Sequence, residues 1–312
     1  MNVTREQVLG YRLRAHQLDR ADGHDVTDVA ILDLGVQNTG PDAAGWALVN
    51  RGVGPDQAGD PDGKLVIAWT LRGAPHVYRR EDIAEVAAAV APFSDADAAK
   101  RIFDAAKPLR EAGIGIIDAL DEVAGQMRSI VTKPTVKGDM SGRLSNQMGD
   151  PYLRFCRPCN VIHLYEQPFR LAALRAGLEL QPGTSPPVLQ PINGWHGPAK
   201  KASPRFDVIR AYLHFFGPAA PKTVAAYMDA PVKDVKEHWP AETVEVDVNG
   251  VTLSALEGDV ADLQPSSTED VRLLSPFDPY LQSRPRTRGP RHLPSQGALG
   301  GARTTGRHPR RQ

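Results

Sequence analysis

The two cysteines of the chain and a nearby histidine have the spacing of half a zinc site. Two residues separate Cys156 from Cys159, and His163 follows four positions later. Cysteine and histidine are preferred ligands of Zn²⁺, but a closed structural site needs four ligands. Three other histidines are distant in sequence, in segments that fit helices or loops of their own: His196, His214 and His238. We therefore predict no metal site.

The two cysteines are better interpreted as a structural pair in a reducing cytoplasm. A chain of 312 residues with two cysteines has no disulfide framework. A redox dithiol is the alternative, because a Cys-x-x-Cys motif also serves that chemistry. The βαβ pattern expected around such a motif is missing here.

Asp278 is a further candidate, because it lies between two prolines at residues 276–280, Pro-Phe-Asp-Pro-Tyr. Proline fixes the backbone on either side, so the segment should hold one shape. Its carboxylate could face a cleft and support a water molecule. The interpretation that we favour is that it caps a turn, which is a common role of aspartate.

The charge of the chain is unevenly distributed. The whole sequence has 37 basic and 37 acidic residues, and residues 285–312 contain seven arginines and no Asp or Glu. Residues 1–284 therefore hold 30 basic and 37 acidic residues, a net charge of −7. Specific DNA-binding proteins usually show a basic face. Because the net charge of residues 1–284 is negative, such a face would require basic residues to cluster locally.

Residues 285–312 are rich in Arg, Pro and Gly and have almost no apolar periodicity. Such a segment buries too little surface to fold, so we predict a disordered tail. It could be a basic arm that binds DNA phosphates without sequence preference. The hypothesis that we favour is a frameshift or sequencing error in a GC-rich gene, whose alternate frames are rich in these residues.

The rest of the composition is typical of a folded protein, with 41% hydrophobic and 24% charged residues. The longest apolar runs are shorter than the roughly 18 residues needed to span a bilayer. The first residues have no apolar segment typical of a signal peptide. We therefore expect a cytoplasmic protein with no membrane partner.

The first part of the chain, residues 1–82, has the pattern of helices followed by a hairpin. Thr4 and Gln7 form a predicted capping box, and further helices are expected at residues 26–34 and 42–51. A β-rich run at residues 65–71 turns and returns at 76–78. This order is typical of a winged helix. Arg72 and His76 are then expected at the exposed tip of the wing, where they could contact phosphate or a minor groove, or serve solubility alone.

The second part, residues 83–180, begins with alanine-rich helices and is the least regular. Its polar segment at residues 139–148 is a candidate recognition helix, and we expect Arg143 within it to contact DNA. Residues 153–164 are predicted to be extended and residues 167–178 helical. Residues 181–204 are rich in Pro and Gly and are expected to form a linker or a long loop.

The third part, residues 205–284, has the clearest pattern. Three short helices are followed by alternating apolar residues on both sides of Asn249-Gly250, the strongest two-residue hairpin signal. This predicts a helix-turn-helix with a wing, whose third helix would enter a major groove. Lys233 and Lys236 of that helix could contact DNA, but acidic residues alternate with them. A scaffold role for this unit is the competing interpretation.

The order of four segments resembles the bacterial winged-helix DNA glycosylases of the AlkZ and YcaQ kind. The segments are Leu-Gly-Val-Gln-Asn-Thr-Gly-Pro at 34–41, Trp-Thr-Leu-Arg-Gly-Ala-Pro-His at 69–76, Glu-Gln-Pro-Phe-Arg-Leu-Ala-Ala-Leu at 166–174 and Leu-Leu-Ser-Pro-Phe-Asp-Pro-Tyr-Leu at 273–281. The resemblance implies an α+β fold, mainly α, in which three tandem winged-helix units form a concave surface around double-stranded DNA. It also implies excision of alkylated purines without metal or cofactor.

The family's catalytic signature is Gln, any residue, then Gln or Asp. The matching positions are Gln37, Asn38 and Thr39, so Gln37 and Thr39 are the expected catalytic residues. An amide both donates and accepts hydrogen bonds and can orient a water molecule, whereas the threonine hydroxyl is a poor base at neutral pH. We predict a monomeric, nucleoid-associated DNA glycosylase for alkylated N7 or N3 purines. The alternative is a non-catalytic DNA-binding or regulatory protein.

Overall fold

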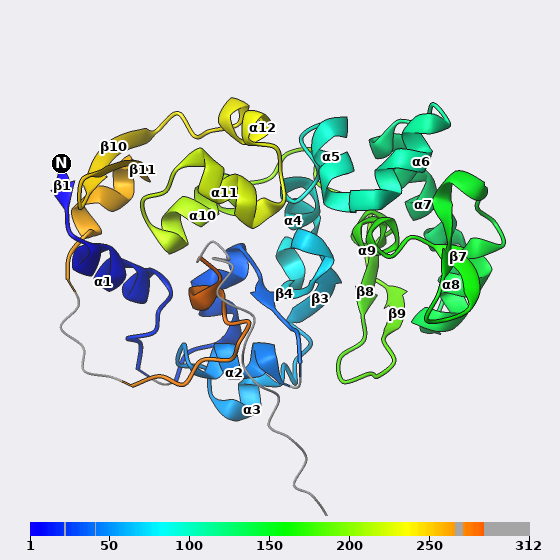
Figure 1. Ribbon diagram of the computed structural model, residues 1–312. Helices are drawn as coiled ribbons and strands as arrows, with labels where there is room; N and C mark the ends of the chain where they lie inside the picture. The colour runs from blue at the N-terminus through cyan, green and yellow to red at the C-terminus, as the bar shows by residue number, and fades with distance from the viewer. Residues whose placement is uncertain (22, 41, 266–270, 284–312) are drawn as a thin grey trace, which may run out of the picture.

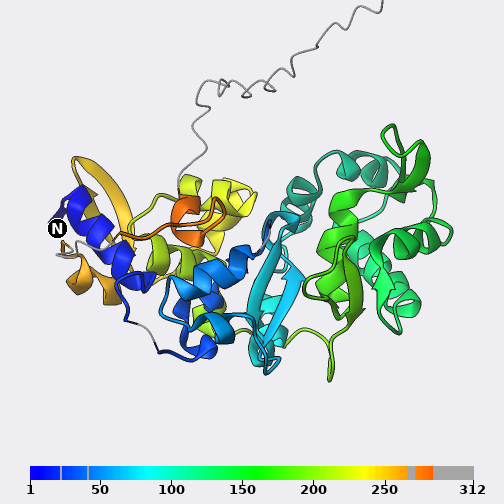
Figure 2. The same cartoon turned by 90° about the horizontal axis from the view of Figure 1, so that it is seen from below.

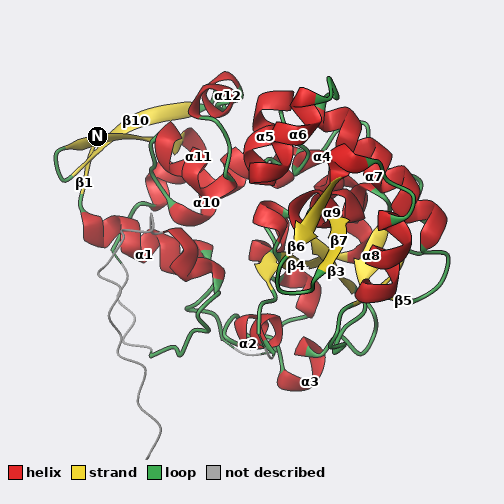
Figure 3. Cartoon of the chain, turned by 45° about the vertical axis from the view of Figure 1, so that its right-hand side comes forward, coloured by secondary structure: helices red, strands yellow, loops and turns green. Residues whose placement is uncertain are grey.

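The computed structural model describes residues 1–21, 23–40, 42–265 and 271–283. The predicted basic tail, residues 285–312, lies outside the described residues. The fold mixes helices with short strands, 48% and 17% respectively, so the helical share predominates as expected (Figure 3). In the described part of the chain, no helix is long and apolar enough to cross a membrane.

A central sheet of three antiparallel strands, in the order β2-β4-β3, is built from residues 36–79. The strands are β2 (Val36–Gln37), β3 (Leu65–Trp69) and β4 (Pro75–Arg79). The helical segments around them are η1 (Val26–Asp28), η2 (Ala30–Asp33), α2 (Ala43–Val49), α3 (Pro55–Ala58), η3 (Leu71–Gly73) and η4 (Arg80–Asp82). The predicted hairpin is confirmed. The single helix predicted at residues 26–34 is instead two 3₁₀ turns, because Val29 between them is extended, with φ −78° and ψ 106°.

A second sheet has the order β5-β9-β8, beside a separate β6-β7 hairpin (Figure 1). The strands are β5 (Thr135–Val136), β6 (Leu153–Cys156), β7 (Val161–Leu164), β8 (Leu178–Leu180) and β9 (Val188–Pro191). The helical segments of this part are α4 (Ile83–Ala89), α5 (Asp95–Ile102), η5 (Phe103–Ala105), α6 (Ala106–Glu111), α7 (Ile116–Ile130), α8 (Lys137–Ser145), η6 (Asp150–Tyr152) and α9 (Glu166–Arg175). The prediction that residues 181–204 form a linker or a long loop missed β9, which pairs with both β5 and β8. Prolines next to this short strand obscure the alternation of residues from which a strand is predicted.

The third part has the predicted order of three helices and a hairpin. Its elements are η7 (Pro204–Phe206), α10 (Val208–Phe216), α11 (Pro221–Met228), α12 (Val232–Glu237), β10 (Thr243–Val248), β11 (Val251–Leu256), η8 (Glu257–Asp262) and η9 (Pro279–Ser283). Asn249 and Gly250 both adopt positive φ, 51° and 85°. Such a pair matches the right-handed twist of the flanking strands. The hairpin predicted from Asn249-Gly250 is therefore confirmed.

The N-terminus joins this third part, which the pattern did not predict. Strand β1 (Asn2–Val3) pairs in parallel with β10 and makes a third sheet, in the order β1-β10-β11. Helix α1 (Arg5–Ala15) begins with the predicted Thr4–Gln7 capping box and packs against α10. Figure 1 shows the dark blue N-terminal segment beside β10 and β11. Residues 1–15 thus lie on the last unit and not on the first.

The central sheet is joined to the third part through one apolar core. Val36, Leu48 and Val77 belong to the same buried cluster as Ile209 and Phe216. The second sheet has its own cluster with α7, α8 and α9, and Trp69 of β3 packs into it against Phe169. Seen from below, the central sheet lies between the other two parts (Figure 2). Packing on both sides holds the loop after β2 in place.

Candidate active site

Gln37 is the last residue of β2 and is 7% exposed. It lies opposite His76 of β4, and the next residue, Asn38, donates its backbone N–H to the oxygen of Pro75 at 2.8 Å. Glycine is needed at position 35, just before β2. Its φ is 95°, and a Cβ there would lie 2.5 Å from the ring of Tyr78. The backbone of the predicted catalytic loop is therefore fixed by the central sheet.

The side chain of Gln37 is held by three neighbours. Its Nε2 donates to the hydroxyl of Thr39 at 2.9 Å. Its Oε1 accepts from Nε2 of Gln282 at 2.9 Å and from Nη2 of Arg72 at 3.3 Å. The Thr39 oxygen keeps a lone pair and its own proton for another partner. The structure thus brings the two expected catalytic residues together, with Thr39 at the more exposed position.

Arg72 points inward from the tip of the first hairpin. Its backbone is left-handed, with φ 58°, and its Nη1 donates to the backbone oxygen of Tyr227 at 2.9 Å. The guanidinium also lies over the ring of Tyr227, 4.8 Å from its centroid, and donates to Oε1 of Gln282 at 2.6 Å. The expectation that Arg72 stands at an exposed tip is wrong, because these contacts turn it toward Gln37 and α11.

His76 is only 1% exposed, so the expectation of an exposed wing residue is wrong for it too. Its Nδ1 lies 3.0 Å from both the Thr70 hydroxyl and the Ala74 oxygen. Burial, with a smaller contribution from the nearby charge of Arg72, lowers the pKa of His76 to about 3. The ring is therefore neutral at physiological pH and lies away from any surface that a DNA duplex could contact.

Asp278 is 1% exposed and does not face the cleft. Its two carboxylate oxygens each accept from the guanidinium of Arg51 at 2.9 Å, and Oδ1 also accepts from the backbone N–H of Tyr280. The turn-capping interpretation is confirmed, and support of a cleft water is wrong. The buried ion pair instead anchors the segment that carries Gln282 to Gln37.

The missed residue is Gln282, whose side chain reaches both Gln37 and Arg72. It lies 245 residues from Gln37 in sequence. The only sequence signal was the rigid segment at 276–280 just before it. Nothing in that pattern indicated which side chain would cover the catalytic loop.

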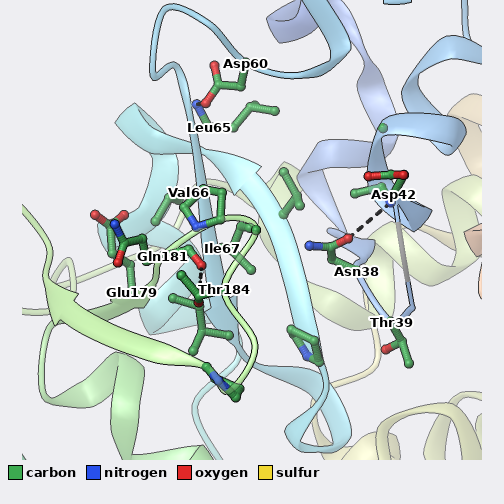
Figure 4. Close-up of a pocket in the computed structure, with 18 of the residues that line it drawn as sticks. Asn38, Thr39, Asp42, Asp60, Leu65, Val66, Ile67, Glu179, Gln181 and Thr184 are labelled. Atoms are coloured by element: carbon green, nitrogen blue, oxygen red, sulfur yellow. Dashed lines mark hydrogen bonds between the residues drawn. The ribbon is translucent and has the colours of Figure 1, made fainter. Parts of the chain in front are cut away.

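A cleft of about 1330 Å³ opens beside the loop. Asn38 and Thr39 line one wall, and Gln181 and Thr184 of the β8–β9 connection line the other, with β3 between them (Figure 4). Four basic side chains also line the cleft, namely Arg72, Arg80, Lys137 and Arg170, together with the acidic Asp42, Asp60 and Glu179. Lys137 and Arg170 share the carboxylate of Glu166, at 2.7 and 2.6 Å. Arg80 pairs with Glu179 at 2.8 Å, so the lining of the cleft carries charges of both signs.

The other predicted DNA contacts do not line this cleft. Arg143 is exposed on α8, whereas Lys233 and Lys236 are exposed on α12, in a different part of the fold (Figure 1). Lys233 has Glu237 as a partner at 3.8 Å. DNA contact by these three residues stays a prediction.

The comparisons with known proteins agree with the order of the motifs. Residues 31–289 match the family described as DNA glycosylase AlkZ-like. The fold is similar to that of the DNA glycosylase AlkZ of Streptomyces sahachiroi, with a TM-score of 0.67 and 19% sequence identity, over 91% of this chain and 78% of that chain. The comparison with curated proteins gives no match. Because the family match covers most of the sequence, this chain belongs to the AlkZ-like DNA glycosylase family.

Proposed function

We propose that the chain is a DNA glycosylase that releases purines alkylated at N7 or N3 from double-stranded DNA. The observation that carries the proposal is the hydrogen bond from the buried Gln37 to Thr39, which lines the cleft. The cleft exceeds the roughly 300–1,000 Å³ of typical ligand pockets. It therefore has room for a nucleotide turned out of the duplex, which such chemistry on a base requires.

The alkylated nucleobase needs little further activation to leave. Alkylation at N7 or N3 gives the purine a positive charge and makes it a good leaving group. The N-glycosidic bond breaks and its electrons leave with the base, and water adds to the sugar carbon and then loses one proton to solvent. The enzyme must hold the water and stabilise the cationic sugar in the transition state.

We assign the water to Thr39 and the orientation of Thr39 to Gln37. Because Gln37 donates to the Thr39 oxygen, the threonine proton and one lone pair are free to hold a water molecule. Thr39 cannot act as a strong base, so the water must attack while it is still neutral. Purines with the most labile glycosidic bonds are therefore the expected substrates.

Arg72 serves binding and positioning in this proposal. Its guanidinium touches neutral oxygens of Gln37, Gln282 and Tyr227 and, among the residues that the structure describes, no carboxylate. A cation beside the reacting sugar would oppose its developing positive charge. The same cation attracts a DNA phosphate, so we place a backbone phosphate, and not the sugar ring, next to Arg72.

A duplex that contains 7-methylguanine tests this function. Release of the free base is measured by liquid chromatography for the wild type, Gln37→Ala, Thr39→Ala and the exposed control Lys107→Ala. Removal of a group that acts in the transition state typically costs about 100- to 1,000-fold in rate, and we expect a loss in this range for Gln37→Ala. Unchanged release by Gln37→Ala would refute the site assignment.

A second function, DNA binding without catalysis, is favoured by one observation. Gln37 Oε1 already accepts two hydrogen bonds, and the family's second catalytic position is Thr39, which has no carboxylate. Tight binding of the duplex as a monomer, with no base released, would support this alternative. Absence of binding at low salt would exclude both functions, and with them the proposed location at the nucleoid.

A further inference from the structure

The β6–β7 hairpin brings the two cysteines and His163 together. Their ligand atoms all lie within 4.8 Å of one another. Pairing of Cys156 with Val161 and of Arg154 with His163 sets the register. Alternate residues of a strand share a face, so Cys156 and His163 lie diagonally on one face of the hairpin. Cys159 joins them from the turn.

The turn between the strands has the geometry of a metal-binding loop. Asn160 follows the second cysteine with φ 53°, so the chain reverses immediately after Cys159. The Cys159 backbone N–H and the His163 side chain both lie within hydrogen-bonding reach of the Cys156 sulfur. The thiolate is the form of cysteine that binds metal.

His163 is oriented for the same role. Its Nδ1 lies 2.6 Å from the backbone oxygen of Leu164. A carbonyl only accepts, so Nδ1 carries the proton and Nε2 keeps its lone pair. Histidine ligands of metals are typically fixed in this way by a backbone carbonyl.

We propose that Cys156, Cys159 and His163 bind one Zn²⁺ ion, with a water molecule as the fourth ligand. Ligand atoms around tetrahedral zinc are roughly 3.5–3.8 Å apart for bonds of about 2.0–2.3 Å. The three atoms lie within 4.8 Å of one another, so binding of the ion would require side-chain rotations that bring them to that distance. Two thiolates and an imidazole favour zinc over Mg²⁺ or Ca²⁺, which prefer oxygen ligands. Binding releases the two thiol protons to solvent.

Four protein ligands, which the sequence does not offer here, are needed only where a zinc site is closed. Three protein ligands and a water are an established zinc arrangement when one position stays open, and the partial exposure of this group allows water to reach it. The site belongs to a two-stranded hairpin with Phe155 and Ile162 exposed, 58% and 62%. Such a hairpin is marginally stable alone, so the ion would fix its tip. This role is independent of the proposed glycosylase activity.

The test uses the full chain, purified without chelators from zinc-supplemented medium. Elemental analysis should find about one zinc per chain in the wild type. Cobalt added to the metal-free protein should give a thiolate-to-cobalt charge-transfer band that saturates at about one equivalent. Absence of this band in the folded wild type would overturn the proposal, whatever the variants do.

Three substitutions and one control locate the site. Loss of an outer partner of a metal ligand costs about 10- to 100-fold in affinity, so Cys156→Ser, Cys159→Ser and His163→Gln should each lose at least that much. His196→Gln replaces an exposed histidine elsewhere and should keep full affinity. Because the chain has only these two cysteines, thiol reagents should find both protected with zinc and both reactive without it. A disulfide, seen as unreactive sulfur without metal until a reductant is added, would also overturn the proposal.

Discussion

Asp278→Ala should destabilise the protein far more than loss of an ordinary surface charge. The substitution leaves the guanidinium of Arg51, whose side chain is 0% exposed, without its carboxylate. The remaining oxygen partner among the described contacts of Arg51 is the backbone oxygen of Ala47, at 2.7 Å. A buried cation without a counter-charge cannot recover its hydration in the folded state. The cost therefore comes mainly from the charge that is left behind.

The expected loss in free energy of unfolding is about 3–5 kcal/mol, the usual cost of removing one partner of a buried pair. Urea unfolding followed by circular dichroism measures it. With a slope of about 3 kcal/mol per molar urea for a large domain, the midpoint should fall by roughly 1–1.7 M. Glu237→Ala removes the exposed partner of Lys233 and should cost less than about 1 kcal/mol.

The double variant Arg51→Met with Asp278→Leu separates the two possible causes. If the unpaired charge is responsible, an apolar pair should be more stable than Asp278→Ala alone. If Asp278→Ala shifts the midpoint no more than Glu237→Ala does, the buried pair is not what anchors residues 276–283, and our account of how Gln282 reaches Gln37 is wrong.

Three further predictions concern the site. Thr39→Asp supplies a carboxylate at the second catalytic position, and we expect at least about tenfold faster release of 7-methylguanine; an unchanged or slower rate would show that Thr39 does not hold the water. Gln282→Ala removes one donor to Gln37 and should change the rate of base release while the urea midpoint stays near that of the wild type; equal rates would exclude a positioning role. Because the folded pKa of His76 is about 3, below its ordinary value of 6.5, the unfolded chain binds a proton below pH 6.5 that the folded chain does not. His76 should therefore reduce stability by about 1.4 kcal/mol per pH unit as pH falls from 6.5 toward 3. Comparison of unfolding at several pH values should show a shallower slope for His76→Gln, and parallel slopes would contradict the burial of His76.

Local patterns determined those elements whose signals lie within a few residues. Alternating valines and the Asn249-Gly250 turn predicted β10 and β11, because strand period and positive φ are properties of neighbouring residues. The capping box at Thr4 and Gln7 was predicted for the same reason. The motif around Gln37 also indicated the family, which the match over residues 31–289 confirms.

Only the tertiary structure decided which side chains meet. Arg72 and His76 look like exposed wing residues in sequence. In the structure, a contact with α11 turns the Arg72 side chain inward, and the central sheet buries His76. Asp278 meets Arg51 across 227 positions, a pairing that no local pattern encodes. Periodicity specifies the face that a residue occupies, whereas its partners depend on how distant elements pack. The sequence by itself therefore determined the local hairpins, the capping box and the family, and the packing decided how Gln37, Thr39 and Gln282 form one site.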